Sequence, residues 1–284
     1  MRAIMTTLIS DSSTLYSQAE ARKQGIYTVP LNVIVDQKNY REFEDIQSSQ
    51  LLKMIQENKI PSSSLPSIGE KIDLYNEIDD DIIDITMAKG LSSTYEAALT
   101  ARESCDHPEK VTIVNARTLC GPHRLLVDTA NAMLKAGKSR EDVLTMLDAS
   151  IPTEVSFLIP RDFSFLQRGG RISHLAAGVG GLLKLIPLMI KSEDGERIEK
   201  FDVFRTFKKC ATSIAAYCKE KGMDSTYEFF VSHANNEEDA LKMEAVLHKE
   251  FPEAKIVIYP LSPAFVTQGG PQCVAIQAIK ICNE

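Results

Sequence analysis

The residues most suited to chemistry in this 284-residue chain are hydroxyl side chains that follow short strand-like runs. In the clearest case, a β-branched run ending at Thr86 leads to Gly90, to the cluster Ser92, Ser93 and Thr94, and then to an alanine-rich helical pattern. The first N–H groups of a helix have no internal partner and carry partial positive charge, so this turn is suited to binding an anion. The simpler alternative is that one serine only caps the helix.

Two more hydroxyl-rich segments precede this one. Residues 10–14 (SDSST) follow an apolar strand pattern, and residues 60–67 (IPSSSLPS) read as a rigid extended loop. A helix is expected over 68–78, since Ser67 and Glu70 have capping-box spacing. Strands alternate with helices in this part of the chain, which predicts a mostly parallel sheet covered on both faces. Such sheets bind ligands outside the carboxyl ends of their strands, so we expect all three segments on that rim.

A serine hydrolase that uses Ser92 is the catalytic alternative. The order of strand, turn, serine and helix resembles a nucleophile elbow, but residues 90–94 read GLSST rather than G-x-S-x-G. Among the five histidines, only His174 and His233 are candidates for the base. The chain has no phosphate-binding loop, no dinucleotide fingerprint and no clustered metal ligands. We therefore expect no catalytic residues, no cofactor and no metal.

The composition of the chain disfavours nucleic acids and membranes as partners. A net charge of -7 and the absence of Trp disfavour nucleic acid as a ligand. The longest apolar stretch, residues 175–190, is broken by Lys184 and Pro187 and is too short to cross a bilayer, so no stable membrane insertion is expected. The apolar run near Met1 is too short for a signal peptide, and the six scattered cysteines form no C-x-x-C. A cytoplasmic protein is expected.

The pattern changes after Pro152, which predicts an N-terminal α/β domain over 1–152 and a C-terminal α/β domain over 153–284. In the second part, residues 192–196 (SEDGE) separate two strand-like runs and predict a hairpin. Further strands are expected over 154–160, 227–232, 255–259 and 273–281, with helices over 162–167, 206–221 and 236–250. This order predicts a mixed sheet.

Together these features suit an amphiphile with a small anionic head. Hydroxyl groups and helix-end amides would hold the head, and Arg168 and Arg171 flank a glycine pair nearby. Apolar side chains of 175–190 would line a tunnel for the tail, at about 0.8 kcal/mol per buried CH₂. The alternative is that this apolar segment simply fills the core.

Taken in order, the motifs of the chain resemble the DegV family of bacterial fatty-acid-binding proteins. The similar segments are residues 7–13 (TLISDSS), 29–31 (VPL) with Asp45, 63–67 (SSLPS), 91–98 (LSSTYEAA), 166–173 (LQRGGRIS), 194–195 (DG) and 205–209 (RTFKK). No single motif is specific, but their order and spacing across nearly the whole chain are.

The resemblance implies two α/β domains with a lipid tunnel between them, and a long-chain fatty acid as ligand. It implies that the fatty carboxylate is held by Ser63, with Ser64 beside it, and by Ser92, with Ser93 next to it. It also implies that Arg171 and Arg205 contact a partner or a phosphate. ATP chemistry would belong to a separate fatty acid kinase subunit, and the chain itself would be a lipid-binding protein rather than an enzyme. A lipid-responsive interaction or regulatory protein is the remaining alternative.

The chain departs from the family pattern near this expected site. Residues 265–272 (FVTQGGPQ) place Gln268 where kinase-coupled members carry a histidine. A glutamine amide donates hydrogen bonds to a carboxylate but never becomes a cation. Ser63, Leu65 and Ser93 stand in place of threonine, glutamine and glycine, and Ile186 replaces a lysine. These changes indicate a divergent member with Gln268 at the carboxylate.

Overall fold

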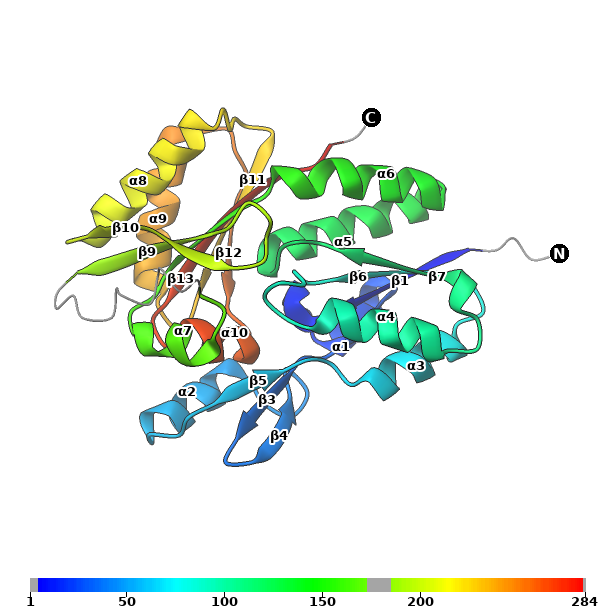
Figure 1. The fold of residues 1–284 in the computed structure, drawn as a ribbon. Helices are drawn as coiled ribbons and strands as arrows, with labels where there is room; N and C mark the ends of the chain where they lie inside the picture. Colours follow the sequence, from blue (N-terminus) through cyan, green and yellow to red (C-terminus); the bar gives the residue numbers. More distant parts are fainter. Residues whose placement is uncertain (1–4, 173–184, 283–284) are drawn as a thin grey trace.

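The computed structural model describes residues 5–172 and 185–282, and in it two α/β units lie side by side (Figure 1). The expected apolar segment 175–190 lies mostly outside the described residues, as does His174. The first unit contains β1 (Thr6–Asp11), η1 (Ser12–Thr14), α1 (Gln18–Gln24), β2 (Ile26–Val29), β3 (Asn32–Val35), β4 (Lys38–Arg41), α2 (Ser48–Gln56), β5 (Ser62–Ser64), α3 (Ile68–Glu77), β6 (Asp81–Thr86), α4 (Thr94–Ser104), η2 (Pro108–Lys110), β7 (Val111–Asn115), α5 (Cys120–Lys135) and α6 (Arg140–Ser150).

The main sheet of this unit is parallel, with strand order β2-β1-β6-β7. Neighbouring residues of β1 point to opposite faces: Leu8 packs with α5 and α6, whereas Ile9 packs with α3 and α4. Both faces are therefore covered by helices, as expected for a parallel sheet. The predicted cap of α3 is present, since Ser67 Oγ accepts the Glu70 N–H at 3.2 Å.

The run over residues 26–35, expected as one strand, is two strands in two different sheets. Pro30, which cannot donate a ladder hydrogen bond, lies between the two strands. β2 joins the parallel sheet, and β3 forms a second, antiparallel sheet with β4 and β5. The segment around Ser63, expected as an extended loop, is therefore the strand β5 of this small sheet.

The second unit follows η3 (Ile151–Thr153) and contains a mixed six-stranded sheet of order β10-β9-β8-β13-β11-β12. Its elements are β8 (Val155–Ile159), α7 (Phe163–Gly169), β9 (Ile186–Lys191), β10 (Ile198–Phe204), α8 (Phe207–Glu220), β11 (Tyr227–His233), α9 (Glu237–Glu250), β12 (Ile256–Pro260), α10 (Pro263–Gly269) and β13 (Val274–Lys280). The predicted hairpin is β9–β10, which pair antiparallel.

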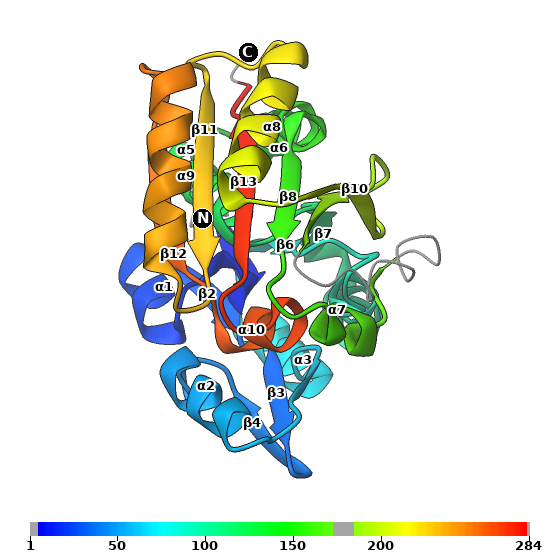
Figure 2. The same ribbon diagram turned by 90° about the vertical axis from the view of Figure 1, so that its left-hand side faces the viewer.

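The two faces of the six-stranded sheet have different neighbours. One face, including Val274, Ile276 and Ala278 of β13, packs on α8 and α9. The alternate residues Cys273, Ala275 and Gln277 face the other way, toward the first unit. Figures 1 and 2 place α7 and α10 at the end of this sheet, next to the β3–β4–β5 sheet and α2. The space between the two units is therefore bounded by a sheet face, two short helices and the loop after β6.

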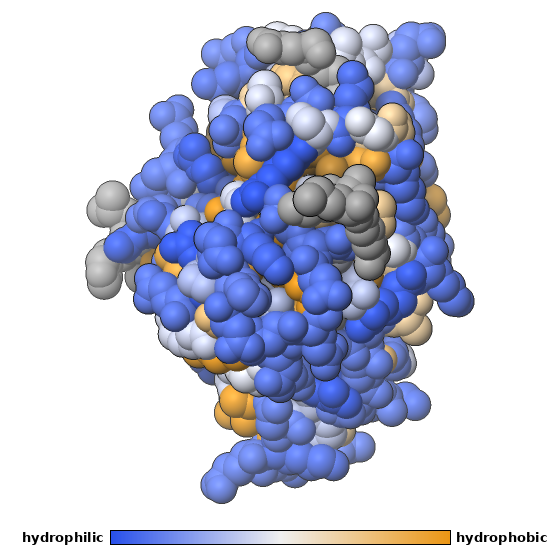
Figure 3. Space-filling model, turned by 90° about the vertical axis from the view of Figure 1, so that its right-hand side faces the viewer, coloured by the Kyte–Doolittle hydropathy of each residue, from blue (hydrophilic) through white to orange (hydrophobic). Residues whose placement is uncertain are grey.

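The outer surface offers little contiguous apolar area on the side of the first unit. Figure 3 shows this side as mainly hydrophilic, with hydrophobic residues in small separate patches. Within the described part of the chain, only Met5, Ile60 and Leu241 are large exposed hydrophobic residues. The apolar side chains that could meet a ligand thus lie inside the molecule rather than on its surface.

Candidate functional site

A polar cavity lies where the loop after β6, the strand β5 and the helix α10 meet. We call it the head chamber. The space among its lining atoms is about 680 Å³, which includes space open to solvent. Six of the seven residues predicted as site residues line it: Ser63, Ser64, Ser92, Ser93, Arg171 and Gln268. The structure therefore brings together side chains that are far apart in the sequence.

The serines after β6 do not cap the helix through their side chains. α4 begins at Thr94, and its N-cap residue Ser93 makes no side-chain capping bond. The Ser92 hydroxyl instead bonds the Thr94 hydroxyl at 2.7 Å. Ser93 is exposed and Ser92 is half-buried. Because neither serine is committed to the backbone of α4, both hydroxyl groups remain suited to a ligand.

Gln268 connects α10 to β5 across the head chamber. Its Nε2 donates to Ser63 Oγ at 2.9 Å. The side chain lies against α7, where a Cβ built at Gly169 would be 2.1 Å from Gln268 Oε1. No real Cβ approaches an atom so closely, so only glycine at 169 permits this position of the amide. Gly169, the first glycine of the pair before Arg171, therefore makes room for Gln268.

Arg171 brings the positive charge of the head chamber. Its Nε donates to Leu91 O at 3.1 Å, and its Nη1 donates to Gly169 O. These bonds connect the segment after α7 to the loop after β6. Arg205, predicted to have a similar role, is exposed between β10 and α8 and lines none of the cavities described here.

Two apolar cavities adjoin the head chamber along the face of the six-stranded sheet that points toward the first unit. The middle chamber, about 590 Å³, shares Met87, Leu91, Arg171, Phe265 and Gln268 with the head chamber. The far chamber, about 430 Å³, shares Leu91, Leu119, Leu158, Ile198 and Ala275 with the middle chamber. The three cavities are therefore neighbours, and in this order their lining changes from partly polar to mainly apolar.

Two cysteines of the middle chamber contribute apolar rather than charged surface. Burial raises the pKa of the Cys273 thiol to about 12 and that of the Cys120 thiol well above its usual range. Both thiols are therefore protonated at neutral pH and behave as small hydrophobic groups. They do not add a charge that a hydrocarbon tail would have to desolvate.

The first of the three hydroxyl segments does not reach the head chamber, contrary to expectation. Ser12, Ser13 and Thr14 form η1 and are fully buried. Ser12 Oγ donates to Glu42 Oε1 at 2.5 Å, and Ser13 Oγ bonds His123 Nδ1 at 2.6 Å. Their hydroxyl groups therefore satisfy buried partners instead of a ligand.

His233, which was considered as a catalytic base, already has a hydrogen-bond partner. His233 Nδ1 accepts the Asn236 N–H at 3.1 Å, and burial lowers the pKa of this imidazole. No histidine of residues 5–172 and 185–282 lines the head chamber. Over the same residues, no three His, Cys, Asp or Glu side chains could hold a metal ion together.

Phe265, Leu158, Ala275 and Ile198 are chamber residues that the sequence analysis did not identify. Leu158 and Ala275 sit on the interior strands β8 and β13, where alternation of apolar and polar residues is weak, and Ile198 begins the edge strand β10. The signal that could have found this cavity is the pair of small residues Cys273 and Ala275 at the start of β13, where small side chains leave room beside a sheet face. Separately, no helix among the residues that the structure describes is long and apolar enough to cross a membrane.

Two α/β units with a partly polar cavity next to two apolar ones form an arrangement suited to an amphiphilic ligand. The comparisons then identify the family. The profile described as "Uncharacterised protein, DegV family" matches residues 5–280, so the chain belongs to the DegV family. The protein DegV of Bacillus subtilis is 30% identical over 260 residues, which cover 88% of this chain and 91% of that protein.

Solved structures show the same fold. The crystal structure of DegV from Bacillus subtilis, described as a fatty acid binding protein, has a TM-score of 0.84 and 26% identity, and the match covers 98% of this chain and all of that one. A DegV family protein from Eubacterium eligens, loaded with heptadecanoic acid, has a TM-score of 0.85 at 19% identity, covering 98% of this chain and all of that one. The predicted two-domain α/β fold and the family resemblance are thus confirmed.

Proposed function

We propose that this protein binds one long-chain fatty acid, with its carboxylate in the head chamber and its tail in the middle and far chambers. The observation that carries the proposal is that the three chambers adjoin one another through shared lining residues, with polar side chains in the head chamber and mainly apolar ones in the other two. Relatives with the same fold are described as fatty-acid-binding proteins or were solved with a fatty acid.

The head chamber has the donors that a carboxylate needs. Ser63 and Ser92 offer hydroxyl groups from two different elements, and Arg171 offers a guanidinium beside them. Charge-assisted hydrogen bonds of this kind are about twice as strong as neutral ones. Gln268 keeps Ser63 in place through its amide and adds no charge. Arg171 is therefore the cation that we assign to the carboxylate.

The direct test is to extract purified protein with organic solvent and identify the lipid by mass spectrometry. We expect about one fatty acid per chain, or uptake of one added palmitate or oleate after delipidation. The double variant Ser63→Ala, Ser92→Ala should bind the acid more weakly by about 1–3 kcal/mol, because charged-group contacts are lost. Ser225→Ala, an exposed serine remote from the chambers, is the control. Absence of any stoichiometric acid in both experiments would contradict the proposal.

We further propose that the bound acid is presented to a separate kinase subunit. The support is that the chain has no phosphate-binding loop, while Ser93 at the mouth is exposed. In the test, loaded protein is incubated with ATP alone or with ATP and an extract of the cells that make it, and acyl phosphate is trapped with hydroxylamine. Acyl hydroxamate is expected only with the extract. Its absence in both cases, or its formation with ATP alone, would contradict presentation.

A further inference from the structure

The far chamber ends on polar side chains rather than on more hydrocarbon. On the face of the sheet that points toward the first unit, Leu158 of β8 pairs with Ala275 of β13, and Ser156 pairs with Gln277. The second pair lies two residues further along the strands, about 7 Å beyond the first. Both Ser156 and Gln277 line the far chamber, together with Lys191 of β9. The side chains that line the far chamber therefore change from apolar to polar within two residues along these strands.

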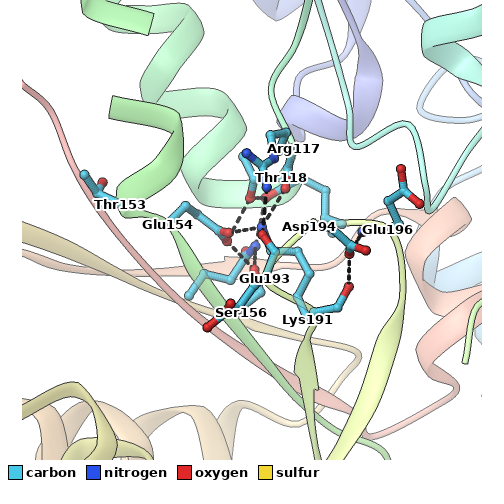
Figure 4. Close-up of polar contacts among 12 residues, drawn as sticks. Arg117, Thr118, Thr153, Glu154, Ser156, Lys191, Glu193, Asp194 and Glu196 are labelled. Atoms are coloured by element: carbon cyan, nitrogen blue, oxygen red, sulfur yellow. Dashed lines mark hydrogen bonds and ion pairs between the residues drawn. The ribbon is translucent and has the colours of Figure 1, made fainter. Parts of the chain in front are cut away.

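Three polar side chains around this end, those of Thr118, Ser156 and Lys191, contact one carboxylate, that of Glu154 (Figure 4). Glu154 accepts from Thr118 at 2.9 Å and from Ser156, and it forms an ion pair with Lys191. The Glu154 side chain is fully buried, and the Lys191 side chain is 9% exposed. Lys191 also donates to Arg117 O at 2.6 Å. The charges of this cluster are thus compensated.

Gln277 is the member of the cluster that is only half satisfied. Its Nε2 donates to Leu119 O at 3.0 Å and to Ser156 Oγ at 2.9 Å. A backbone carbonyl only accepts, so the bond to Leu119 fixes which end of the amide is nitrogen. Gln277 Oε1 is then left buried without a hydrogen-bond partner among the described residues. Gln277 is 2% exposed, and an unmet acceptor at such burial is costly.

The far chamber is also lined by an ammonium group, that of Lys191, which has more hydrogens than partners. The Lys191 ammonium carries three hydrogens, and its partners in the described part of the chain are Glu154 and Arg117 O. Gln277, which has the acceptor without a partner, and Lys191, which has the additional donor hydrogen, both line the far chamber. A methyl-terminated tail satisfies neither group. A hydroxyl group both donates and accepts, so it matches the pair.

We infer that the far chamber recognises a hydroxyl group on the distal part of the acyl chain, so that the ligands include hydroxy fatty acids. The inference rests on the proposed function. The ion pair of Glu154 and Lys191 by itself would explain a tie between the two units, because Arg117 and Thr118 belong to the first unit. This connection between the units does not require an amide side chain at position 277. An apolar side chain there would leave no buried acceptor without a hydrogen-bond partner.

The test compares delipidated native protein and Gln277→Met for binding of stearic acid and of its 10-, 12- and 18-hydroxy derivatives. In native protein, at least one hydroxy acid should bind about fivefold or more tighter than stearic acid, the effect of one well-made buried hydrogen bond. In Gln277→Met, that preference should disappear while stearic acid binds at least as tightly. The control Leu158→Met, one strand repeat away, should change the binding of both acids equally.

Equal or weaker binding of every hydroxy acid by native protein would overturn the inference, as would a preference that survives in Gln277→Met. If no acid binds at all, the proposed function fails instead, so the two failures are distinct. A crystal structure of native protein with the preferred hydroxy acid tests the inference without a variant. It should place the hydroxyl oxygen within hydrogen-bond distance of Gln277 Oε1, and a hydroxyl elsewhere would overturn it.

Discussion

Replacing Glu42 with glutamine should remove a pH dependence from the stability of the protein. Glu42 is fully buried; Ser12 Oγ donates to its Oε1, and the Ala264 N–H at the start of α10 donates to its Oε2 at 2.9 Å. Burial, with a smaller effect of the Asp11 carboxylate, raises the pKa of Glu42 from 4.5 to about 7. A glutamine keeps the same shape and can accept from Ala264 and donate to Ser12.

The sign of the effect follows from proton binding. Between about pH 4.5 and pH 7, folded Glu42 holds a proton that the unfolded chain has lost, so the free energy of unfolding falls as the pH rises. A shift from 4.5 to about 7, at about 1.4 kcal/mol per pH unit, makes this fall about 3 kcal/mol at most. Above pH 7 both states are ionised and the contribution is constant. The Glu42→Gln variant has no ionisable group at this position, so its free energy of unfolding lacks this decrease with pH.

The assay is urea unfolding of delipidated native protein and Glu42→Gln at pH 5 and pH 8. The stability of the variant relative to native protein should be higher at pH 8 than at pH 5 by up to about 3 kcal/mol. Glu57→Gln, which removes an exposed carboxylate, should show the native pH dependence. If Glu42→Gln loses the same stability as native protein between the two pH values, the reasoning about this buried carboxyl is refuted.

Three further substitutions test other parts of the account. Lys71→Met leaves the fully buried Asp84 carboxylate without its cation, and should lower the free energy of unfolding by about 3–5 kcal/mol in urea; a loss below about 1 kcal/mol would contradict a compensated buried pair. Gly90→Val should lower thermal stability by about 1–3 kcal/mol, because a Cβ there would be 2.0 Å from Glu196 Cα in the β9–β10 turn; an unchanged melting temperature would contradict this close contact. Arg171→Gln should weaken fatty acid binding by about 1–3 kcal/mol and leave binding of the methyl ester unchanged; equal losses for acid and ester would contradict a charge contact.

Much of the fold could be predicted because it depends on local patterns. The β9–β10 hairpin follows from a turn signal between two strand-like runs, and the cap of α3 from the spacing of Ser67 and Glu70. The splitting of residues 26–35 between two sheets could not be predicted, because each half reads as a strand and only tertiary packing decides its neighbour. Pro30 marks where the two strands separate, but it does not indicate which sheet each strand joins.

The polar residues of the head chamber were predictable because their motifs resemble a family, not because spacing places them together. Ser63 and Gln268 are far apart in the chain, and their hydrogen bond depends on how α10 packs against β5. The burial of Ser12 was unpredictable for the same reason: its partner Glu42 comes from the end of a different sheet. The orphan oxygen of Gln277 likewise depends on Leu119, a contact between the two units.

A crystal structure of the delipidated protein reloaded with stearic acid tests the central claim most directly. The account predicts the carboxylate about 2.7–3.2 Å from the Ser63 and Ser92 hydroxyl groups and next to Arg171, with the tail passing Phe265 toward Ala275. A carboxylate at Lys191 with the tail directed to the mouth, or a fatty acid bound outside the three chambers, would contradict it.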